Sequence, residues 1–429
     1  MLFEGDNAIV NEVYKVNNYK KYADKFGSNV CAFLVAVLFY SMGRFGFWEI
    51  LGIKRPAEVV LIVVIFVLCL PIIIKSNKYW RHTFFWLFIL FFICELFLRM
   101  DILRIVELGV GIIIVSLIIS MSPRFKEQCL IWIIRFAGVF AILGIIQFFI
   151  LFFIPELESY TTLSFDQYYG NTNLLIENPV TLLGLTDGSH YTIFGHQVTR
   201  MRSFTSEPSL IPFYFMIAAS LAFTFKSRVS NWGWVILLFS FITLSGSVFL
   251  SILFCLLFSP LLMIGRGYVI TPFMILISLF LILTFFSIDP LINIIQKIEI
   301  YTNGAYSKTT SATVRFGYIL SVYKELIQHP LGMKQRLDLP VGLFINSMAT
   351  AGLLGLIFIA NIAVKLFNSI GKLFNNNQLI TRQKFGLALL YGVYVMIFTF
   401  NDYGSFQAVG LILLLLIYEH LMNMRTMIT

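Results

Sequence analysis

Charged residues are scarce in this sequence. Asp, Glu, Lys and Arg together make up 12% of the 429 residues, while hydrophobic residues make up 59% and aromatic residues 16%. The mean hydropathy is +0.86, and a chain with so few charges has too little polar surface for a water-facing globular domain. This scarcity excludes an ordinary soluble domain and predicts a polytopic membrane protein.

Cysteines are also few, and they are confined to apolar segments. They are Cys31, Cys69, Cys94, Cys129 and Cys255. Because none lies in a long polar loop, the sequence predicts neither a disulfide framework nor a zinc site. The chain also has no glycine-rich phosphate-binding loop and no repeat, so we expect no nucleotide hydrolysis, no metal and no cofactor.

Apolar runs recur along the chain, and a hydrocarbon core about 30 Å thick is crossed by a helix of about 20 residues. These runs predict about twelve transmembrane helices, and hence an all-α fold, in one integral membrane domain over residues 1–429. The expected crossings are 29–48, 57–74, 82–98, 104–121, 130–154, 208–225, 232–247, 248–264, 268–287, 341–366, 384–400 and 404–421. The polar N-terminal segment lacks a cleavable signal pattern, so we expect the first run to remain as a helix.

The stretch 232–264 decides the orientation, because it reads either as one long helix or as two short helices. With two helices, both termini and the short basic connections lie on the cytoplasmic side, as the positive-inside bias requires. Those basic residues are Lys75, Lys78, Arg81, Arg124, Lys126, Lys226, Arg228, Arg266, Lys365, Lys372, Arg382, Lys384 and Arg425. Against the bias, Lys54, Arg55, Arg99 and Arg104 fall in short external loops.

The net charge of +9 is explained by these inward-facing basic connections, which lie beside anionic lipid headgroups. Nucleic acid is therefore not an expected partner.

Two external loops, 155–207 and 288–340, are far longer than the other connections, and loops of this length usually carry function. We expect short amphipathic helices in them. In the first loop, Tyr160, Tyr168, Tyr169 and Tyr191 could stack on sugar rings or could anchor the loop at the membrane interface.

The first loop ends in RMRSFTSEPS at 200–209, directly before an apolar helix. Pro208 suits a first helical turn, and Ser206 or Glu207 can cap it. The helix N-terminus and the planar forks of Arg200 and Arg202 together match the oxygens of a diphosphate. Alternatively, an arginine pairs with Glu207 and reaches the lipid headgroups.

The second loop contains an apolar pattern of helical spacing from Thr313 to Lys334, ended by Pro330 and Gly332. We expect an amphipathic helix on the outer surface. Arg315 falls in its first turn, where a cation is disfavoured unless an anion is bound nearby. His329 lies at the other end, where it could cap the helix or act as an acid or base.

Ionisable residues also occur inside the apolar runs, where they are costly and usually face a partner or a cavity. They are Arg44, Glu95, Glu107 and Arg135, with Asp402 at a helix end. One interpretation is structural pairing, for example of Glu95 or Glu107 with Arg135. Asp402, next to Tyr403, could face the same external cavity as the arginines.

These motifs occur in a recognisable order. LGIIQFF at 143–149, RMRSFTSEPS, VRFGYILSVYKELIQHPLG, and Asn346 before AGLLG at 351–355 together resemble the pattern of Wzy-type O-antigen polymerases. The resemblance covers about residues 130 to 360. It implies a GT-C-type membrane fold, a location in the inner membrane with both long loops periplasmic, and essential arginines at Arg200 or Arg202 and at Arg315.

Two departures from the family pattern matter. Many relatives have an arginine after the Thr243-Leu244-Ser245 position, whereas here Gly246 and Ser247 follow. The histidine motif of O-antigen ligases requires a glycine eleven positions on, and here Pro340 stands eleven positions after His329. The pattern therefore favours a polymerase over a ligase; a capsule or exopolysaccharide polymerase, or a flippase for lipid-linked sugars, is an alternative.

The resemblance implies a metal-independent glycosyl transfer. A sugar hydroxyl of one undecaprenyl-diphosphate-linked repeat unit attacks the anomeric carbon of another, and Arg200, Arg202 and Arg315 stabilise the leaving diphosphate. Glu207 or His329 takes the proton, although Glu207 could instead orient an arginine. A chain-length regulator is an expected partner. Residues expected to bind substrate are Ser203, Ser206, Tyr318, Lys324, Asn346, Asp402 and Tyr403.

Overall fold

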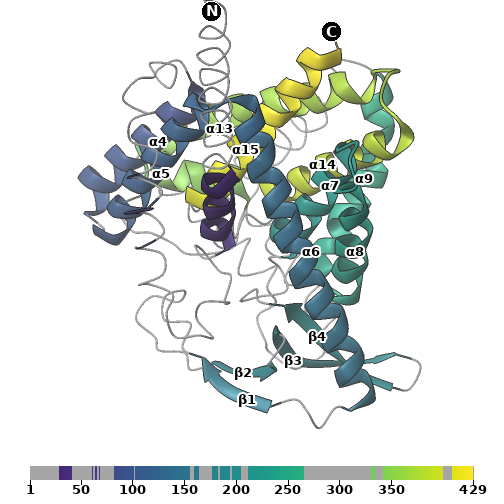
Figure 1. Cartoon of the computed structure of the whole chain (residues 1–429). Coiled ribbons are helices and arrows are strands. Elements are labelled where there is room, and N and C mark those ends of the chain that lie inside the picture. The colour runs from purple at the N-terminus through teal and green to yellow at the C-terminus, as the bar shows by residue number, and fades with distance from the viewer. Residues whose placement is uncertain are drawn as a thin grey trace, which may run out of the picture.

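The computed structural model describes residues 29–40, 82–100, 102–154, 159–163, 176–181, 184–193, 196–203, 211–264, 330–333, 342–399 and 408–428, with residues 60, 63, 64 and 67. Most of these residues form a bundle of helices (Figure 1). The helices are Asn29–Tyr40, α4 (Thr83–Cys94), η2 (Glu95–Arg99), α5 (Ile102–Ser120), α6 (Pro123–Phe153), η5 (Pro212–Met216), α7 (Ile217–Thr224), α8 (Ser230–Ile242), α9 (Gly246–Ile264), α13 (Leu343–Phe374), α14 (Thr381–Thr399) and α15 (Ala408–Ile428).

The helical prediction holds for the crossings that the structure describes. The crossing expected at 268–287 lies outside the described residues, as does most of 57–74. Two of the described helices, α6 and α13, are long and apolar enough to cross a membrane. Helices Asn29–Tyr40, Leu108–Ser120, Pro212–Thr224, Ser230–Ile242 and Gly246–Leu257 are apolar but shorter.

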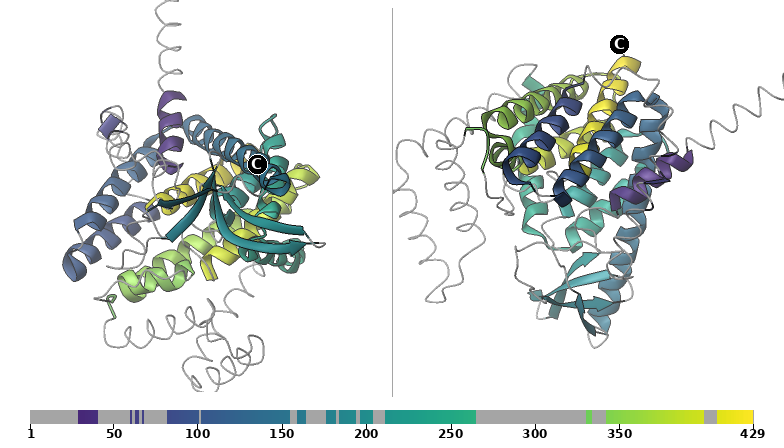
Figure 2. Two further views of the ribbon diagram at one scale, coloured as in Figure 1. Left: turned by 90° about the horizontal axis from the view of Figure 1, so that it is seen from below. Right: turned by 90° about the vertical axis from the view of Figure 1, so that its left-hand side faces the viewer.

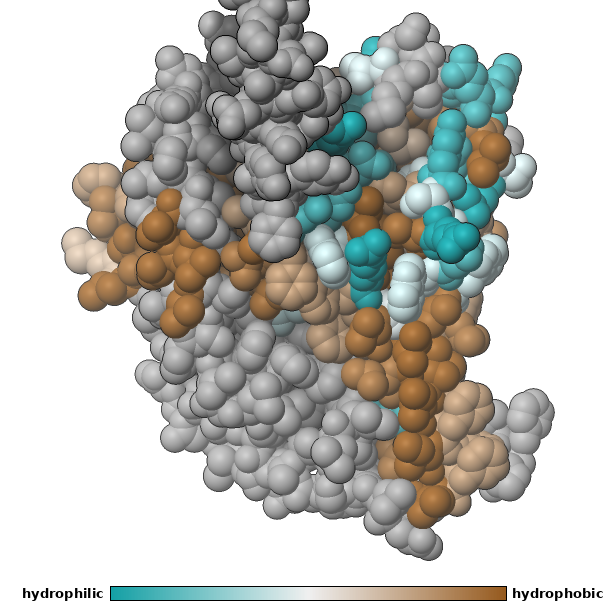
Figure 3. Space-filling view, viewed as in Figure 1, coloured by the Kyte–Doolittle hydropathy of each residue, from teal (hydrophilic) through white to brown (hydrophobic). Residues whose placement is uncertain are grey.

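Helix α6 is apolar both on its buried faces and on its exposed face. Only 39% of its most apolar window is buried inside the protein. Val139, Ile142, Ile146, Phe149 and Phe153 are exposed and recur at helical spacing along one side. A core helix of a soluble protein would be largely covered, so an apolar exposed stripe points to a lipid surround. The stripe is visible as the hydrophobic band that runs down α6 in Figure 3.

One end of the bundle is polar and cross-linked. Lys126, in the first turns of α6, donates from Nζ to Glu419 Oε2 of α15 at 2.7 Å, and His82 Nε2 lies 3.1 Å from Glu419 Oε1. At the same end, Gln383 Nε2 donates to the Thr224 carbonyl at 2.8 Å, joining α14 to α7. Hydrophilic residues gather over this half of the molecule in Figure 3. We call it the basic end, because Arg124, Lys126, Arg382, Lys384 and Arg425 lie on the helix turns that form it.

The stretch 232–264 forms two antiparallel helices. Asn375 Nδ2, at the C-terminal cap of α13 and shortly before α14 begins at Thr381, donates to the Leu262 carbonyl of α9 at 2.7 Å. Helix α8 begins at Ser230, shortly after Thr224 at the basic end. Since both Ser230 and Leu262 lie near that end, α8 and α9 run in opposite directions, with the turn 243–245 far from it. The two-helix interpretation is therefore correct.

Small residues allow the helices to pack closely. A Cβ at Gly138 or Gly144 of α6 would overlap the ring of Trp232 or Phe239 of α8. Close approach at small residues is a main source of helix association in lipid, where burial of apolar surface supplies little driving force. The interface between α6 and α8 therefore depends on these two glycines.

The first long loop forms a sheet. Strands β1 (Ser159–Leu163), β2 (Ile176–Thr181), β3 (Gly184–Ile193) and β4 (His196–Ser203) pair in the order β1-β2-β3-β4, all antiparallel. The expectation of an all-α fold with short helices in this loop is wrong here. Segments such as SYTTL, SHYTI and HQVT are rich in the β-branched and aromatic residues that favour strands, and only two residues link β3 to β4, as in a hairpin.

The sheet lies at the end of the molecule opposite the C-terminus. Figure 1 and the right-hand view of Figure 2 both show it beside the C-terminal part of α6, while α15 ends at the other pole. Strands β3 and β4 contact α6. The sheet is therefore separated from the basic end by the length of the bundle.

Candidate functional site

The predicted arginine positions lie on β4, at two irregularities of the sheet. Ser203 pairs with Leu185 and Met201 pairs with Thr186, so position 202 is an extra residue on β4. Position 200 is opposite an insertion on β3, because the next pair is Thr199 with His190. Bulges of this kind re-aim side chains and occur often next to active sites.

Strand β4 packs against α6, beside the C-terminal part of that helix (Figure 1). A strand held against a rigid helix gives Arg200, Arg202 and Ser203 a fixed backbone at the pole opposite the basic end (Figure 1). The structure thus brings these three predicted residues onto one strand.

The other predicted site residues fall into two groups. Asn346 lies on α13 and is 8% exposed. The remainder lie outside the described residues: Ser206, Glu207, Arg315, Tyr318, Lys324, His329, Asp402 and Tyr403. Arg44 also lies there, as do the tyrosines at 168 and 169.

Helix α13, which carries Asn346, is broken near its start. Ala351 (φ −134°, ψ 24°) and Gly352 (φ 61°, ψ −147°) are not helical, and they separate Leu343–Thr350 from the remainder of the helix. Only glycine adopts the conformation of position 352 readily. Discontinuous helices in membrane proteins often lie beside binding sites.

A buried ion pair contacts this break. Arg99 Nη1 donates to Glu95 Oε1 at 2.9 Å, and the two side chains are 6% and 2% exposed. Arg99 Nη2 donates to the carbonyls of Ala349 and Thr350, at 2.9 and 3.1 Å. Arg99 was expected in a short external loop, but it is the last residue of η2, and its charge is used inside the bundle.

The expected pairing of Glu95 with Arg135 is also wrong. Glu95 pairs with Arg99, one helical turn away, while the Arg135 guanidinium lies over the Trp132 ring at 4.8 Å. A cation over an aromatic face gains electrostatic stabilisation without a carboxylate. The spacing of Glu95 and Arg99 is the usual one for a helical ion pair and was the signal that sequence analysis missed.

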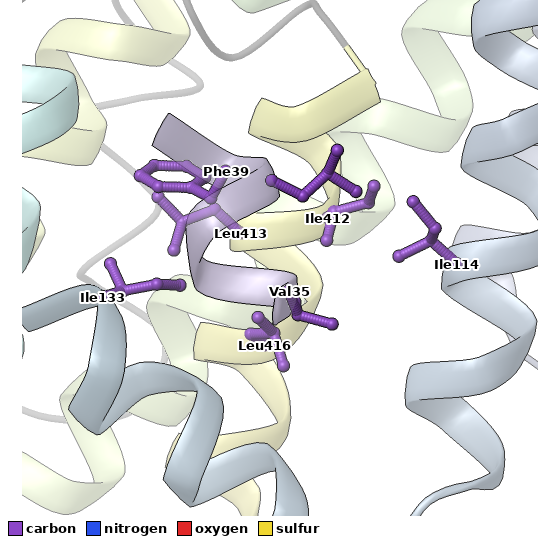
Figure 4. Close-up of a pocket in the computed structure, with 8 residues that line it drawn as sticks. Val35, Phe39, Ile114, Ile133, Ile412, Leu413 and Leu416 are labelled. Atoms are coloured by element: carbon purple, nitrogen blue, oxygen red, sulfur yellow. The ribbon is translucent and has the colours of Figure 1, made fainter. Parts of the chain in front are cut away.

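The described pockets are not close to β4. Figure 4 shows a cavity of about 10 Å³ between helix Asn29–Tyr40, α5, α6 and α15, where Val35, Phe39, Ile114 and Ile412 point inward. Its lining is apolar throughout, so it offers no group for chemistry. A larger pocket of about 170 Å³ lies beside His82, Thr83, Lys365 and Tyr418 at the basic end.

Among the described residues, no three His, Cys, Asp or Glu side chains gather as metal ligands. No protein-family model matches the chain, and no curated protein matches it. The features that bear on function are therefore strand β4 with its two arginines, the broken helix α13 and the opposite polarity of the two ends of the bundle.

Proposed function

We propose that this chain is a surface-polysaccharide polymerase of the Wzy type, which joins undecaprenyl-diphosphate-linked repeat units on the periplasmic face of the inner membrane. The proposal includes about twelve crossings, a GT-C-type arrangement and cytoplasmic termini. It also includes a chain-length regulator as partner.

The observation that carries the proposal is the position of β4. Two arginines stand at the irregular positions of a strand packed on the end of α6, at the pole opposite the basic end. If the basic connections face the cytoplasm, β4 lies on the external side of the membrane. Guanidinium groups carried by a strand at that surface would suit the phosphates of a lipid-linked sugar.

The reaction needs no cofactor. An acceptor hydroxyl oxygen attacks the anomeric carbon of the donor, the bond from that carbon to the diphosphate oxygen breaks, and undecaprenyl diphosphate leaves. Arg200, Arg202 and Arg315 stabilise the growing negative charge on the leaving group. Glu207 or His329 receives the hydroxyl proton.

The test is extension of a defined undecaprenyl-diphosphate repeat unit by the purified protein in lipid nanodiscs, with product length read on a gel. We expect a ladder of products. Arg202→Ala should abolish the ladder, whereas Arg124→Gln, an exposed arginine at the opposite end, should leave it unchanged.

Two alternatives give different results in cells. A ligase defect leaves long lipid-linked polymer that is never attached to the outer lipid, and a flippase defect traps lipid-linked units inside. A polymerase defect leaves single repeat units attached. Absence of extension by the wild-type protein, or either of the first two patterns on disruption, would contradict the proposal.

A further inference from the structure

The break in α13 is a sharp fold rather than a gentle bend. A Cβ placed at Gly355 would overlap the Ser347 carbonyl, although these positions are eight residues apart and far from each other in a straight helix. The short helix Leu343–Thr350 therefore turns back at 351–352 toward the helix that follows it.

The turn Pro330–Met333 is fitted into this fold. Met333 N–H donates to the Ala349 carbonyl at 2.9 Å, and Leu353 N–H donates to the Pro330 carbonyl at 3.3 Å. A Cβ at Gly352 would overlap the Pro330 carbonyl, so this close fit requires glycine there. Two backbone hydrogen bonds thus fasten the C-terminal part of the second long loop to the break.

Arg99 closes the same junction from the other side. The Ala349 carbonyl accepts hydrogen bonds from both Met333 N–H and Arg99 Nη2, and the Thr350 carbonyl accepts from Arg99 alone among the bonds described. A helix C-terminus carries partial negative charge, which a cation stabilises. Glu95 holds the guanidinium in place by its bond to Nη1.

We propose that Arg99 is a positioning residue: by capping the broken end of Leu343–Thr350, it fixes the Pro330–Met333 turn that directly follows His329. This role rests on the proposed function, in which the second loop completes the site. It assigns Arg99 no contact with substrate.

The energetics of the pair favour a geometric role. A buried ion pair is a weak source of stability, and well-packed apolar residues often replace one without loss. In this pair, Glu95 Oε2 and Arg99 Nε are buried with no hydrogen-bond partner among the described residues. The planar fork instead supplies two directed donors to two adjacent carbonyls, which an apolar side chain lacks.

The test combines hydrogen exchange with kinetics on the full-length protein in nanodiscs. Arg99→Gln should speed exchange of the Met333 and Leu353 amides at least tenfold and lower kcat, with little change in KM. Arg99→Lys should restore part of kcat, since a lysine reaches one carbonyl. Lys126→Gln is the matched control: it breaks the buried pair of Lys126 with Glu419 at the basic end but should leave those two amides and kcat unchanged.

Unchanged exchange at Met333 and Leu353 in Arg99→Gln would overturn the positioning role, whatever happens to activity. Equal effects of Lys126→Gln at those amides would overturn it too, because they would show general destabilisation. If the wild-type protein extends no glycan, the proposed function fails. The hydrogen-exchange measurement at Met333 and Leu353 still tests whether Arg99 fixes the turn.

Discussion

Lys126 and Glu419 are 293 positions apart in sequence, yet the Nζ and Oε2 atoms lie 2.7 Å apart. The pair joins the start of α6 to the middle of α15, and its side chains are 7% and 18% exposed. His82 adds a second bond to the same carboxylate, and its Nδ1 accepts from the Phe84 N–H, which leaves the Nε2 proton for Glu419. Three helices therefore meet at one carboxylate.

This junction gives a prediction about stability. Lys126→Met should lower the free energy of unfolding by about 3 kcal/mol, because it leaves a largely buried carboxylate without its cation. Adding Glu419→Gln should restore most of the loss, since no uncompensated charge then remains. Thermal unfolding in detergent measures both variants, and an undiminished Tm for Lys126→Met would show that the pair contributes nothing.

The glycines of α6 give a second prediction. Gly138→Leu should destabilise the bundle by about 1–3 kcal/mol, since its side chain meets the Trp232 ring. Gly246→Leu is a matched control, because nothing lies within 4 Å of a Cβ at Gly246. Cross-linking of α6 to α8 and thermal unfolding report the difference, and equal effects of the two variants would contradict close packing at Gly138.

Orientation can be tested by cysteine labelling. In a background without the native cysteines, Leu244→Cys should react with an impermeant thiol reagent added outside the cell. Ser227→Cys, in the turn between α7 and α8, should react only after the membrane is opened. The prediction follows from the antiparallel course of α8 and α9 and from the positive-inside bias. The reverse labelling pattern would place β4 in the cytoplasm.

The arginines of β4 provide a chemical prediction. Arg202→Ala should reduce glycan extension by about 10²–10³-fold, the usual loss when one preorganised donor to a developing charge is removed. Arg202→Lys should recover only part, because an ammonium group lacks the bidentate fork. Initial rates of extension measure both, and full activity of Arg202→Ala would remove it from the site.

The helices could be predicted because apolar runs of membrane length carry a strong signal. The split of 232–264 into α8 and α9 followed from loop charge alone. The sheet could not be predicted from Arg200, Arg202 and Ser206, which point to the helix that follows, nor from any single Thr, Val or Tyr residue of β1, β3 and β4. The density of β-branched and aromatic residues in these segments, rather than any single residue, carries the strand signal.

The α13 junction could not be predicted, because it depends on contacts between distant segments. AGLLG at 351–355 reads as ordinary helix, and nothing local shows that Pro330 approaches Gly352. For the same reason the sequence gives no sign that Arg99 contacts Ala349, because the two residues are 250 positions apart. The arginines of β4 were found from sequence, although their roles stay a prediction.

The length of α6 has a consequence for the membrane itself. From Cys129 to Phe153, with Arg135 as its one charged residue, the helix spans about 38 Å at about 1.5 Å per residue, whereas a bilayer core is about 30 Å thick. Such hydrophobic mismatch is relieved by tilting the helix or thickening the bilayer. A tilted α6 would carry the sheet sideways as well as outward. The lipid-linked sugar of the proposed reaction would then meet β4 over the edge of the bundle, where its polyprenyl tail could stay in the bilayer.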